Sequence, residues 1–315
     1  MDNYDEKEIP RADKHADKTH PEQTVQQRSS VSFAHDGRCS IPSCNATKAA
    51  QHETSLAGLA RGLVAYETID STNDEAKRLI AASPTPADIP FGTVVVADEQ
   101  TAGRGRLGRV FASPAADSVY MSFILRPVGA ITDTLLITFM AAVATCEAIE
   151  AIAGGEPRIK WVNDIYMEGK KVCGILSEGV SAPGSAAIDA IALGIGVNIN
   201  VPQSDFPEEI RAVAGSVEMN PGDQRRFVAE LIQRVNVGYD KLARGISPIE
   251  SYREKSFVIG KEITVIKAGG SEAPAIAEGI ADDGSLLARY ENGNLEHLIS
   301  GEISLKIREI ERRVE

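Results

Sequence analysis

The sequence has 315 residues, of which 43% are hydrophobic and 25% charged, a composition typical of a soluble globular protein with about two domains. Its formal net charge of −12 argues against broad, nonspecific binding to nucleic acid, although it does not exclude a local basic patch. Residues 1–18 are polar and of mixed charge, unlike a signal peptide. Glu147 and Glu150 interrupt the longest apolar stretch, residues 135–154, which favours a buried helix over a membrane span. We therefore expect a soluble, cytoplasmic protein with no membrane partner.

Residues 1–55 contain few apolar residues and no sustained periodicity, and we expect them to form a disordered tail. A zinc site is an alternative for this segment, because it contains four potential ligands: His35, Cys39, Cys44 and His52. Their spacing matches no common zinc finger, so plain disorder is favoured. The other two cysteines, Cys146 and Cys173, lie far apart in apolar segments and indicate reduced thiols rather than a disulfide framework.

The first part of the ordered chain predicts strands interrupted by helices. Residues 63–70 alternate like a strand, and Thr72, followed by Glu75 three positions later, indicates the capped start of a helix within 71–82. β-branched and apolar residues predict two further strands and then a long helix, at 92–100, 118–127 and 132–153.

The second part of the chain predicts a hairpin, a strand, a helix and then only strands. The hairpin turns at Glu168–Gly169, a glycine-punctuated strand covers 187–201, and a helix over 223–244 ends before Gly245. Short strands follow Phe257 and indicate a small antiparallel barrel; they cover 262–268, 274–281, 285–291 and 295–304, with turns at Asp283–Gly284 and Asn292–Gly293. The predicted fold class is α+β: a mixed sheet flanked by helices over 56–256, followed by a β-barrel over 257–315.

The segment 101–111, TAGRGRLGRVF, combines three glycines and three arginines beside a predicted strand. It could be a DNA minor-groove arm, because glycine lets arginine enter a narrow groove. It could be an anion-binding loop, in which backbone N–H groups and guanidinium groups hold a phosphate or carboxylate. It could also be a solvated surface turn. The segment alone does not decide among these three interpretations.

A second polar cluster lies in the stretch KWVNDIYMEGKKVCGILSE, residues 160–178. Trp161 and Asp164 have plain structural explanations there, as a core residue and a turn cap. The combination is more specific, because a lysine at the start of a buried strand near a carboxylate suits an acyl-phosphate transition state. Further on, Asn198 lies in a glycine-rich apolar strand, where its amide needs a partner or a ligand.

Taken together, six stretches resemble the biotin protein ligases in order and spacing. They are STN (71–73), QTAGRGRLGR (100–109), KWVND (160–164), KKVCGILSE (170–178), GVNIN (196–200) and SGEIS (300–304). Each stretch is weak by itself, but six in register are specific. The resemblance covers the chain from about Tyr66 to its end and does not include the predicted tail.

The resemblance implies a class II synthetase-like catalytic domain followed by an SH3-like β-barrel. It also implies that biotin and ATP, with Mg²⁺, form biotinyl-5′-adenylate and pyrophosphate. The biotinyl group then passes to one lysine on the biotin carboxyl carrier domain of a biotin-dependent carboxylase. We expect either a monomer or a homodimer that forms on ligand binding, and the sequence does not decide between the two.

Residue by residue, the resemblance assigns three overlapping sets. The catalytic residues are Lys171, Arg104 and Asp164, with Lys170 as a less committed neighbour of Lys171. The biotin-binding residues are Ser71, Thr72, Asn73, Gln100, Arg104, Gly105, Arg106, Lys171 and Gly174. The ATP-binding residues are Arg106, Arg109, Phe111, Lys160, Asn163 and Asn198. No protein ligand for a metal is assigned, except that Mg²⁺ with ATP could contact Asp164.

Two positions depart from the family pattern, and two alternative functions follow from the same features. Phe111 stands where a tryptophan often covers the adenine, and Val162 replaces the usual proline of the turn. One alternative is a lipoate-type ligase with the same adenylate chemistry; the full GRGRLGR segment and the terminal barrel favour biotin. The other is a DNA-binding regulator that uses the arginine loop. Residues 1–55 show no recognition helix, so we expect no nucleic-acid binding.

Overall fold

The computed structural model describes residues 62–112, 118–128, 133–181, 185, 187–267, 270–299 and 302–305. The predicted tail over residues 1–55, with its four candidate zinc ligands, lies outside the described residues. The division into a tail, a catalytic domain and a terminal domain therefore stays a prediction.

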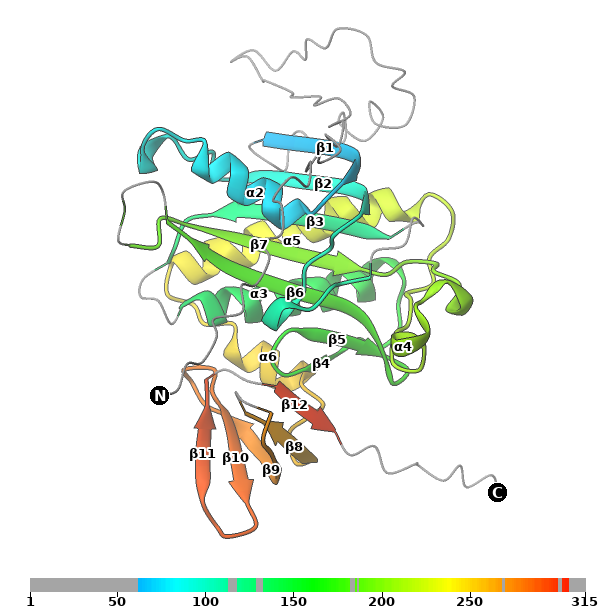
Figure 1. Cartoon of the computed structure of the whole chain (residues 1–315), viewed down its shortest axis with the longest axis vertical. Coiled ribbons are helices and arrows are strands. Elements are labelled where there is room, and N and C mark those ends of the chain that lie inside the picture. Colours follow the sequence, from blue (N-terminus) through cyan, green and yellow to red (C-terminus); the bar gives the residue numbers. More distant parts are fainter. Residues whose placement is uncertain are drawn as a thin grey trace, which may run out of the picture.

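Seven strands form the main sheet, in the spatial order β1-β2-β3-β7-β6-β5-β4 (Figure 1). β1 and β2 run parallel, and every other neighbouring pair runs antiparallel. The predicted mixed sheet is therefore confirmed. In chain order the strands are β1 (Gly62–Ile69), β2 (Thr93–Gln100), β3 (Val119–Leu125), β4 (Arg158–Lys160), β5 (Asp164–Met167), β6 (Lys170–Val180) and β7 (Ala190–Val197).

Helices cover both faces of this sheet, because successive side chains of its central strands point to opposite sides. Val95 and Ile124 pack with α2 (Thr72–Ala81) on one face. Val94 and Phe123 belong to the larger core on the other face, formed with α3, α5 and α6. These helices span Asp133–Ile152, Asp223–Ala243 and Ile249–Lys255, and Figure 1 shows α3 and α5 behind the sheet and α2 in front of it.

The start of α2 lies one residue earlier than predicted. Ser71, not Thr72, is the N-cap, and its hydroxyl accepts a hydrogen bond from the backbone N–H of Asp74 at 3.4 Å. Thr72 is already helical, and its side chain turns inward, where the hydroxyl oxygen lies 3.1 Å from Gln100 Oε1 and 2.8 Å from Ser122 Oγ. The predicted Thr72 cap is therefore wrong, because this hydroxyl serves a tertiary contact instead of the helix end.

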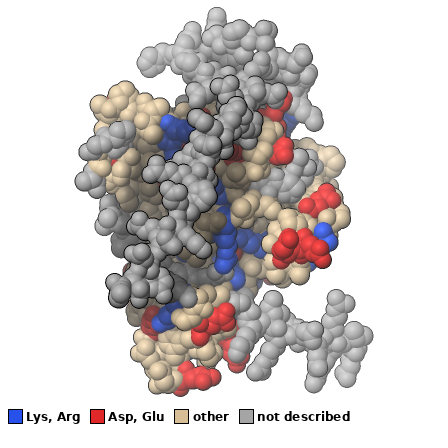
Figure 2. Space-filling view, viewed as in Figure 1, with Lys and Arg blue, Asp and Glu red and all other residues tan. Residues whose placement is uncertain are grey.

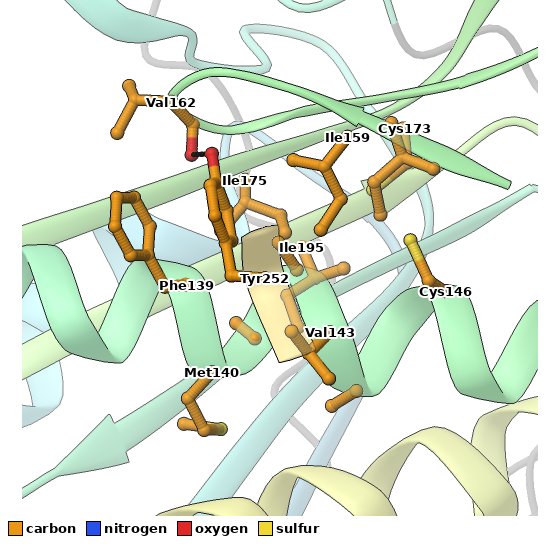
Figure 3. Close-up of a cluster of buried hydrophobic side chains, with 14 of the residues drawn as sticks. Phe139, Met140, Val143, Cys146, Ile159, Val162, Cys173, Ile175, Ile195 and Tyr252 are labelled. Carbon is orange, nitrogen blue, oxygen red and sulfur yellow. Dashed lines mark hydrogen bonds between the residues drawn. The ribbon is translucent and has the colours of Figure 1, made fainter. Parts of the chain in front are cut away.

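The apolar helix α3 is the centre of the core, as Figure 3 shows. Phe139 stacks on Tyr252 of α6 with ring centroids 3.8 Å apart, and Tyr252 Oη donates to the carbonyl of Val162 at 2.9 Å. Residues Thr134–Ile152 are long and apolar enough to cross a membrane by composition alone, but 67% of this window is buried inside the protein. Most of the helix is apolar because it packs between the sheet and α5, while Glu147 and Glu150 near its end form ion pairs with Arg234 and Lys255.

Cys146 and Cys173 are free thiols buried in the same cluster (Figure 3). Burial raises the pKa of the Cys146 thiol to about 12 and that of Cys173 well above its usual value. At pH 8 both thiols are therefore protonated, and the thiolate is the reactive form. We expect iodoacetamide at pH 8 to leave both unmodified in the native protein and to modify both after urea unfolding, as peptide mass spectrometry would show. Rapid native labelling of Cys146 would contradict the described burial.

The predicted hairpin is confirmed: β5 and β6 pair antiparallel, with Glu168 and Gly169 at φ 50° and 77° in the turn. A second hairpin, β4–β5, was not predicted; its turn contains a cis peptide bond between Trp161 and Val162. Other unpredicted elements are α6 and several short ones: α4 (Glu208–Arg211) and 3₁₀ turns at Pro86–Asp88, Arg106–Gly108 and Gln203–Asp205.

The second sheet is antiparallel, in the order β11-β10-β9-β8-β12. Its strands are β8 (Glu262–Ile266), β9 (Glu272–Ile280), β10 (Leu286–Tyr290), β11 (Leu295–Leu298) and β12 (Glu302–Leu305). Gly284 and Gly293 have φ of 85° and 82°, as the two predicted turns require. The single strand predicted over 295–304 is in fact two strands at opposite edges of the sheet. The antiparallel β unit is confirmed, and its closure into an SH3-like barrel stays a prediction.

Candidate active site

A cavity of about 400 Å³ opens between the main sheet, the glycine-arginine loop (residues 101–112) and β12. All fifteen residues predicted for the site line this cavity: Ser71, Thr72, Asn73, Gln100, Arg104, Gly105, Arg106, Arg109, Phe111, Lys160, Asn163, Asp164, Lys171, Gly174 and Asn198. Lys170 does not line it, and its Nζ instead donates to Gln203 Oε1 at 2.9 Å. Six stretches of sequence carried the resemblance, and each of them contributes at least one residue to the lining of this cavity.

The floor of the cavity consists of two paired glycines, Gly174 on β6 and Gly196 on β7. The ring of Phe111 lies on this pair, since a Cβ atom added at Gly174 or Gly196 would come within 2.9 or 2.8 Å of it. Any side chain at these positions would therefore displace the ring. Phe111 also contacts Tyr120 edge-on, with centroids 6.4 Å apart. The two glycines thus let an aromatic ring lie directly on the backbone of β6 and β7.

The glycine-arginine loop closes on itself. Gly105 N–H donates to the carbonyl of Arg109 at 2.7 Å, and Phe111 N–H donates to that of Gly103 at 2.9 Å. Leu107 and Gly108 adopt positive φ of 57° and 74°, which lets the chain reverse in so few residues. The Leu107 side chain is 74% exposed. The loop therefore has its own hydrogen-bonded structure while presenting an apolar residue to solvent.

Two of the cations at the cavity have polar partners within it. Lys171 Nζ lies 2.7 Å from Asp164 Oδ1, and it lies 5.9 Å from the centroid of the Phe111 ring. Arg106 Nη1 donates to Asn163 Oδ1 at 3.3 Å. Figure 2 shows Lys and Arg side chains gathered in the middle of one face of the molecule, with acidic side chains near its edges. The cavity therefore has a positive inner surface on a protein of negative net charge.

Arg104 is held outside this group of cations. Its Nη1 lies 2.7 Å from Asp74 Oδ1, and Lys77 Nζ lies 2.8 Å from the same oxygen. Burial alone would raise the pKa of Asp74, but its hydrogen bonds with Lys77 and Arg104 outweigh burial and lower it. Asp74 is thus a firm anion that ties the loop to α2. Nothing in the sequence predicted this contact.

A chain of polar side chains forms the wall at the start of α2. Thr72 N–H donates to Gln100 Oε1 at 2.8 Å, and Asn73 Nδ2 donates to Glu178 Oε2 at 2.9 Å. Behind them lies the fully buried Ser122 of β3, 2.7 Å from Asn73 Oδ1. Ser122 and Glu178 were not among the predicted site residues. A lone serine in an otherwise apolar and aromatic strand was the available signal.

Asn198 carries an unpartnered acceptor at the cavity. Its Nδ2 donates to the carbonyl of Gly215 at 3.0 Å, whereas its Oδ1 is buried without a hydrogen-bond partner. A buried acceptor of this kind suits a ligand N–H group or a cation. In the part of the chain that the structure describes, no three His, Cys, Asp or Glu side chains form a metal cluster. Asn198 Oδ1 and the Asp164 carboxylate are the oxygens at the cavity that are suited to contact a bound cation.

The segment over residues 201–217 lies beside the first residues of β6. Lys171 N–H donates to the carbonyl of Val213 at 2.8 Å, and Gly215 N–H donates to that of Lys171 at 2.8 Å. Further cavity-lining residues that the sequence did not predict are Phe206, Ile210, Val213, Ala214, Gly194 and, from β12, Ile303. Most are ordinary apolar residues, and no local pattern in the sequence sets them apart.

Two sequence models of known families match the chain. The biotin/lipoate A/B protein ligase family matches residues 66–198, and the biotin protein ligase C-terminal domain matches residues 258–306. The bifunctional ligase/repressor BirA of Bacillus spizizenii is 35% identical over 249 residues, covering 77% of this chain and 74% of the relative. The biotin–[acetyl-CoA-carboxylase] ligase of Paracoccus denitrificans is 33% identical, covering 71% of this chain and 92% of the relative.

Solved structures agree with this relationship. A biotin protein ligase from Aquifex aeolicus, in complex with biotin and ATP, matches with a TM-score of 0.64 and 28% identity. The match covers 78% of this chain and 98% of the Aquifex chain. The family match and these relatives place the chain among the protein ligases of the biotin/lipoate type, and its fold and cationic cavity agree with that class. The chain belongs to the biotin protein ligase family, and its C-terminal match identifies the biotin branch.

Proposed function

We propose that this protein activates biotin with ATP to biotinyl-5′-adenylate and then transfers biotin to a lysine of a biotin carboxyl carrier domain. The observation that carries the proposal is the gathering of fifteen separately predicted residues around one cavity. The names of the Paracoccus relative and the Aquifex structure support biotin and ATP as the substrates. We further propose that the protein works in the cytoplasm.

The activation step joins two anions, the biotin carboxylate and the α-phosphate of ATP. Their repulsion falls where fixed cations face both groups in a partly dehydrated cavity. Lys171 and Arg106 line the cavity and are suited to this task. Arg104 also lines the cavity, but its charge is partly offset by Asp74, whose Oδ1 lies 2.7 Å from Arg104 Nη1. We therefore assign the main electrostatic role to Lys171 and a weaker one to Arg104.

Mg²⁺ fits the available oxygens of the site. Asn198 Oδ1 is a buried acceptor without a partner, and Asp164 supplies a carboxylate. Carboxylate and amide oxygens are ligands that Mg²⁺ accepts, and it typically takes only one or two from protein when it binds a nucleotide. Mg²⁺, when bound, would neutralise charge on the ATP phosphates.

The transfer step needs a neutral amine on the carrier lysine. The amine nitrogen attacks the adenylate carbonyl carbon, a C–N bond forms, and the C–O bond to AMP breaks. Asp164 is suited to accept the proton that the amine releases, because it lines the cavity beside Lys171. The ion pair with Lys171 holds this carboxylate in place.

Transfer of labelled biotin to a purified carrier domain, with ATP and Mg²⁺, tests the proposed function. We expect pyrophosphate release that depends on biotin, followed by label on one carrier lysine. A lipoate-type ligase would instead release pyrophosphate with lipoic acid, and competition between the two acids distinguishes these alternatives. No pyrophosphate release with biotin would refute the proposal. That the protein does not bind nucleic acid, and whether it dimerises with ligand, stay predictions for gel-shift and sedimentation experiments.

The glycine-arginine loop is expected to gain order when ligands bind. Its Leu107 and Val110 are 74% and 78% exposed, and a ligand in the cavity would give the loop a surface to cover. Trypsin should therefore cleave after Arg104 and Arg106 several-fold more slowly with biotin and ATP present. Cleavage after the exposed Arg244, at the end of α5, serves as the control and should not change. Equal cleavage in both conditions would count against closure of the loop.

A further inference from the structure

Ser122 is a buried hydroxyl that touches the site without lining it. It lies on β3, is 0% exposed, and all its strand neighbours are apolar or aromatic. Its Oγ is 2.8 Å from Thr72 Oγ1 and 2.7 Å from Asn73 Oδ1. Both of these partners line the cavity. A fully buried polar group needs hydrogen-bond partners, and Thr72 and Asn73 provide them.

The Asn73 amide has one possible orientation. One end of the amide faces Glu178 Oε2 at 2.9 Å and the carbonyl of Leu176 at 3.3 Å. Both of those atoms can only accept, so this end must be the NH₂ group. The amide oxygen therefore faces Ser122, and because it too can only accept, Ser122 donates its single proton to Asn73.

The Thr72 hydroxyl consequently donates its hydrogen bond to another protein group and not to a ligand. Ser122 Oγ has no proton left for Thr72, so the 2.8 Å contact between the two hydroxyls requires the Thr72 proton. The other internal acceptor in reach is Gln100 Oε1 at 3.1 Å, which also receives the backbone N–H of Thr72. Ser122 Oγ is the nearer acceptor and Gln100 Oε1 already accepts a backbone N–H, so the Thr72 proton goes to Ser122 and Thr72 Oγ1 is left with only lone pairs for a ligand in the cavity.

We infer that Ser122 is a positioning residue that makes Thr72 a hydrogen-bond acceptor, so that the cavity prefers acids carrying an N–H group at this wall. The ureido ring of biotin carries two N–H groups, whereas the dithiolane ring of lipoic acid carries none. Thr72 donates to Ser122, Ser122 donates to Asn73, and Asn73 donates to Glu178. This series of hydrogen bonds thus contributes to the choice between the two acids. This inference rests on the proposed function of the site.

The variant Ser122→Ala tests the inference, with Ser177→Ala as its matched control. Ser177 also has a hydroxyl partner, Thr138 Oγ1 at 2.9 Å, but it does not line the cavity. We expect Ser122→Ala to weaken biotin binding about tenfold, the size of one lost hydrogen bond. KM for ATP and kcat at saturating biotin should stay unchanged, and Ser177→Ala should bind biotin as the wild type does. Wild-type biotin affinity in Ser122→Ala, or an equal loss for ATP, would overturn the inference.

A second measurement separates the proton order from a plain structural role. Titration calorimetry compares biotin with its two mono-N-methyl derivatives, each of which lacks one ureido N–H. We expect the wild type to bind at least one derivative more weakly than biotin. In Ser122→Ala the ratio of the Kd for that derivative to the Kd for biotin should be smaller than in the wild type. Equal affinity of the wild type for all three overturns the inference even if the variant does not fold. Absence of wild-type pyrophosphate release refutes the proposed function separately, because these titrations need no turnover.

Discussion

Lys171→Ala is expected to slow biotin-dependent pyrophosphate release by about 100- to 1000-fold, as loss of a preorganised charge at a developing anion does elsewhere. Lys171 faces the cavity, and its Nζ lies 2.7 Å from Asp164 Oδ1. The protein should stay folded, because the Lys171 side chain is 32% exposed and solvent can take over around Asp164. Quenched-flow measurement of pyrophosphate, together with circular dichroism, checks both parts of this prediction.

The neighbouring Lys170 provides the control for this experiment. Lys170 carries the same charge one position earlier but binds Gln203 outside the cavity. Lys170→Ala should therefore keep pyrophosphate release within a few-fold of the wild type. Near-normal release by Lys171→Ala would mean that its assigned role is wrong. An equal loss in both variants would indicate that the general positive charge matters rather than one placed ammonium group.

Local pattern was sufficient for most of the fold, whereas the site residues were predicted from the resemblance of six short stretches to the biotin protein ligases. The β-branched run that predicts β2 and the apolar run that predicts α3 are strong local signals, and the structure forms both. The site residues lie in short stretches rich in glycine, charge and amide groups, which rarely serve the core. These stretches converge because β6 and β7 pair along their length and bring Gly174 opposite Gly196.

The remaining features depend on contacts that the local sequence does not encode. Asp74 looked like an ordinary first-turn residue of a helix, yet it ties down Arg104. The Phe111 ring lies on the glycine floor, a contact that the sequence did not predict, and its place beside the adenine stays a prediction. The Thr72 hydroxyl, predicted as a cap, turns to tertiary partners. Each case is a side chain whose position is fixed by another element, and no periodicity or turn pattern reports such a contact.

Gly194→Ala is expected to weaken biotin binding more than tenfold and to lower the free energy of unfolding by about 1–3 kcal/mol, the usual cost of overpacking. A Cβ atom at Gly194 would lie 2.4 Å from Asn73 Oδ1 and 2.9 Å from its Cγ. Asn73 cannot retreat, because Ser122 and Glu178 hold both ends of its amide. The substitution therefore pushes the polar wall out of place. Urea unfolding and titration with biotin measure the two effects.

Two other glycines show whether this effect is specific. At Gly279 of β9 an added Cβ would meet only Leu287 Cδ1, at 3.7 Å, so Gly279→Ala should change neither stability nor biotin affinity. At Gly196 the added Cβ would meet the ring of Phe111, which belongs to the loop and can move away. Gly196→Ala should therefore lower the free energy of unfolding less than Gly194→Ala does. It should still move the Phe111 ring away from the glycine floor. If Gly194→Ala binds biotin normally, Asn73 has no part in the biotin site, and the polar wall must serve folding alone.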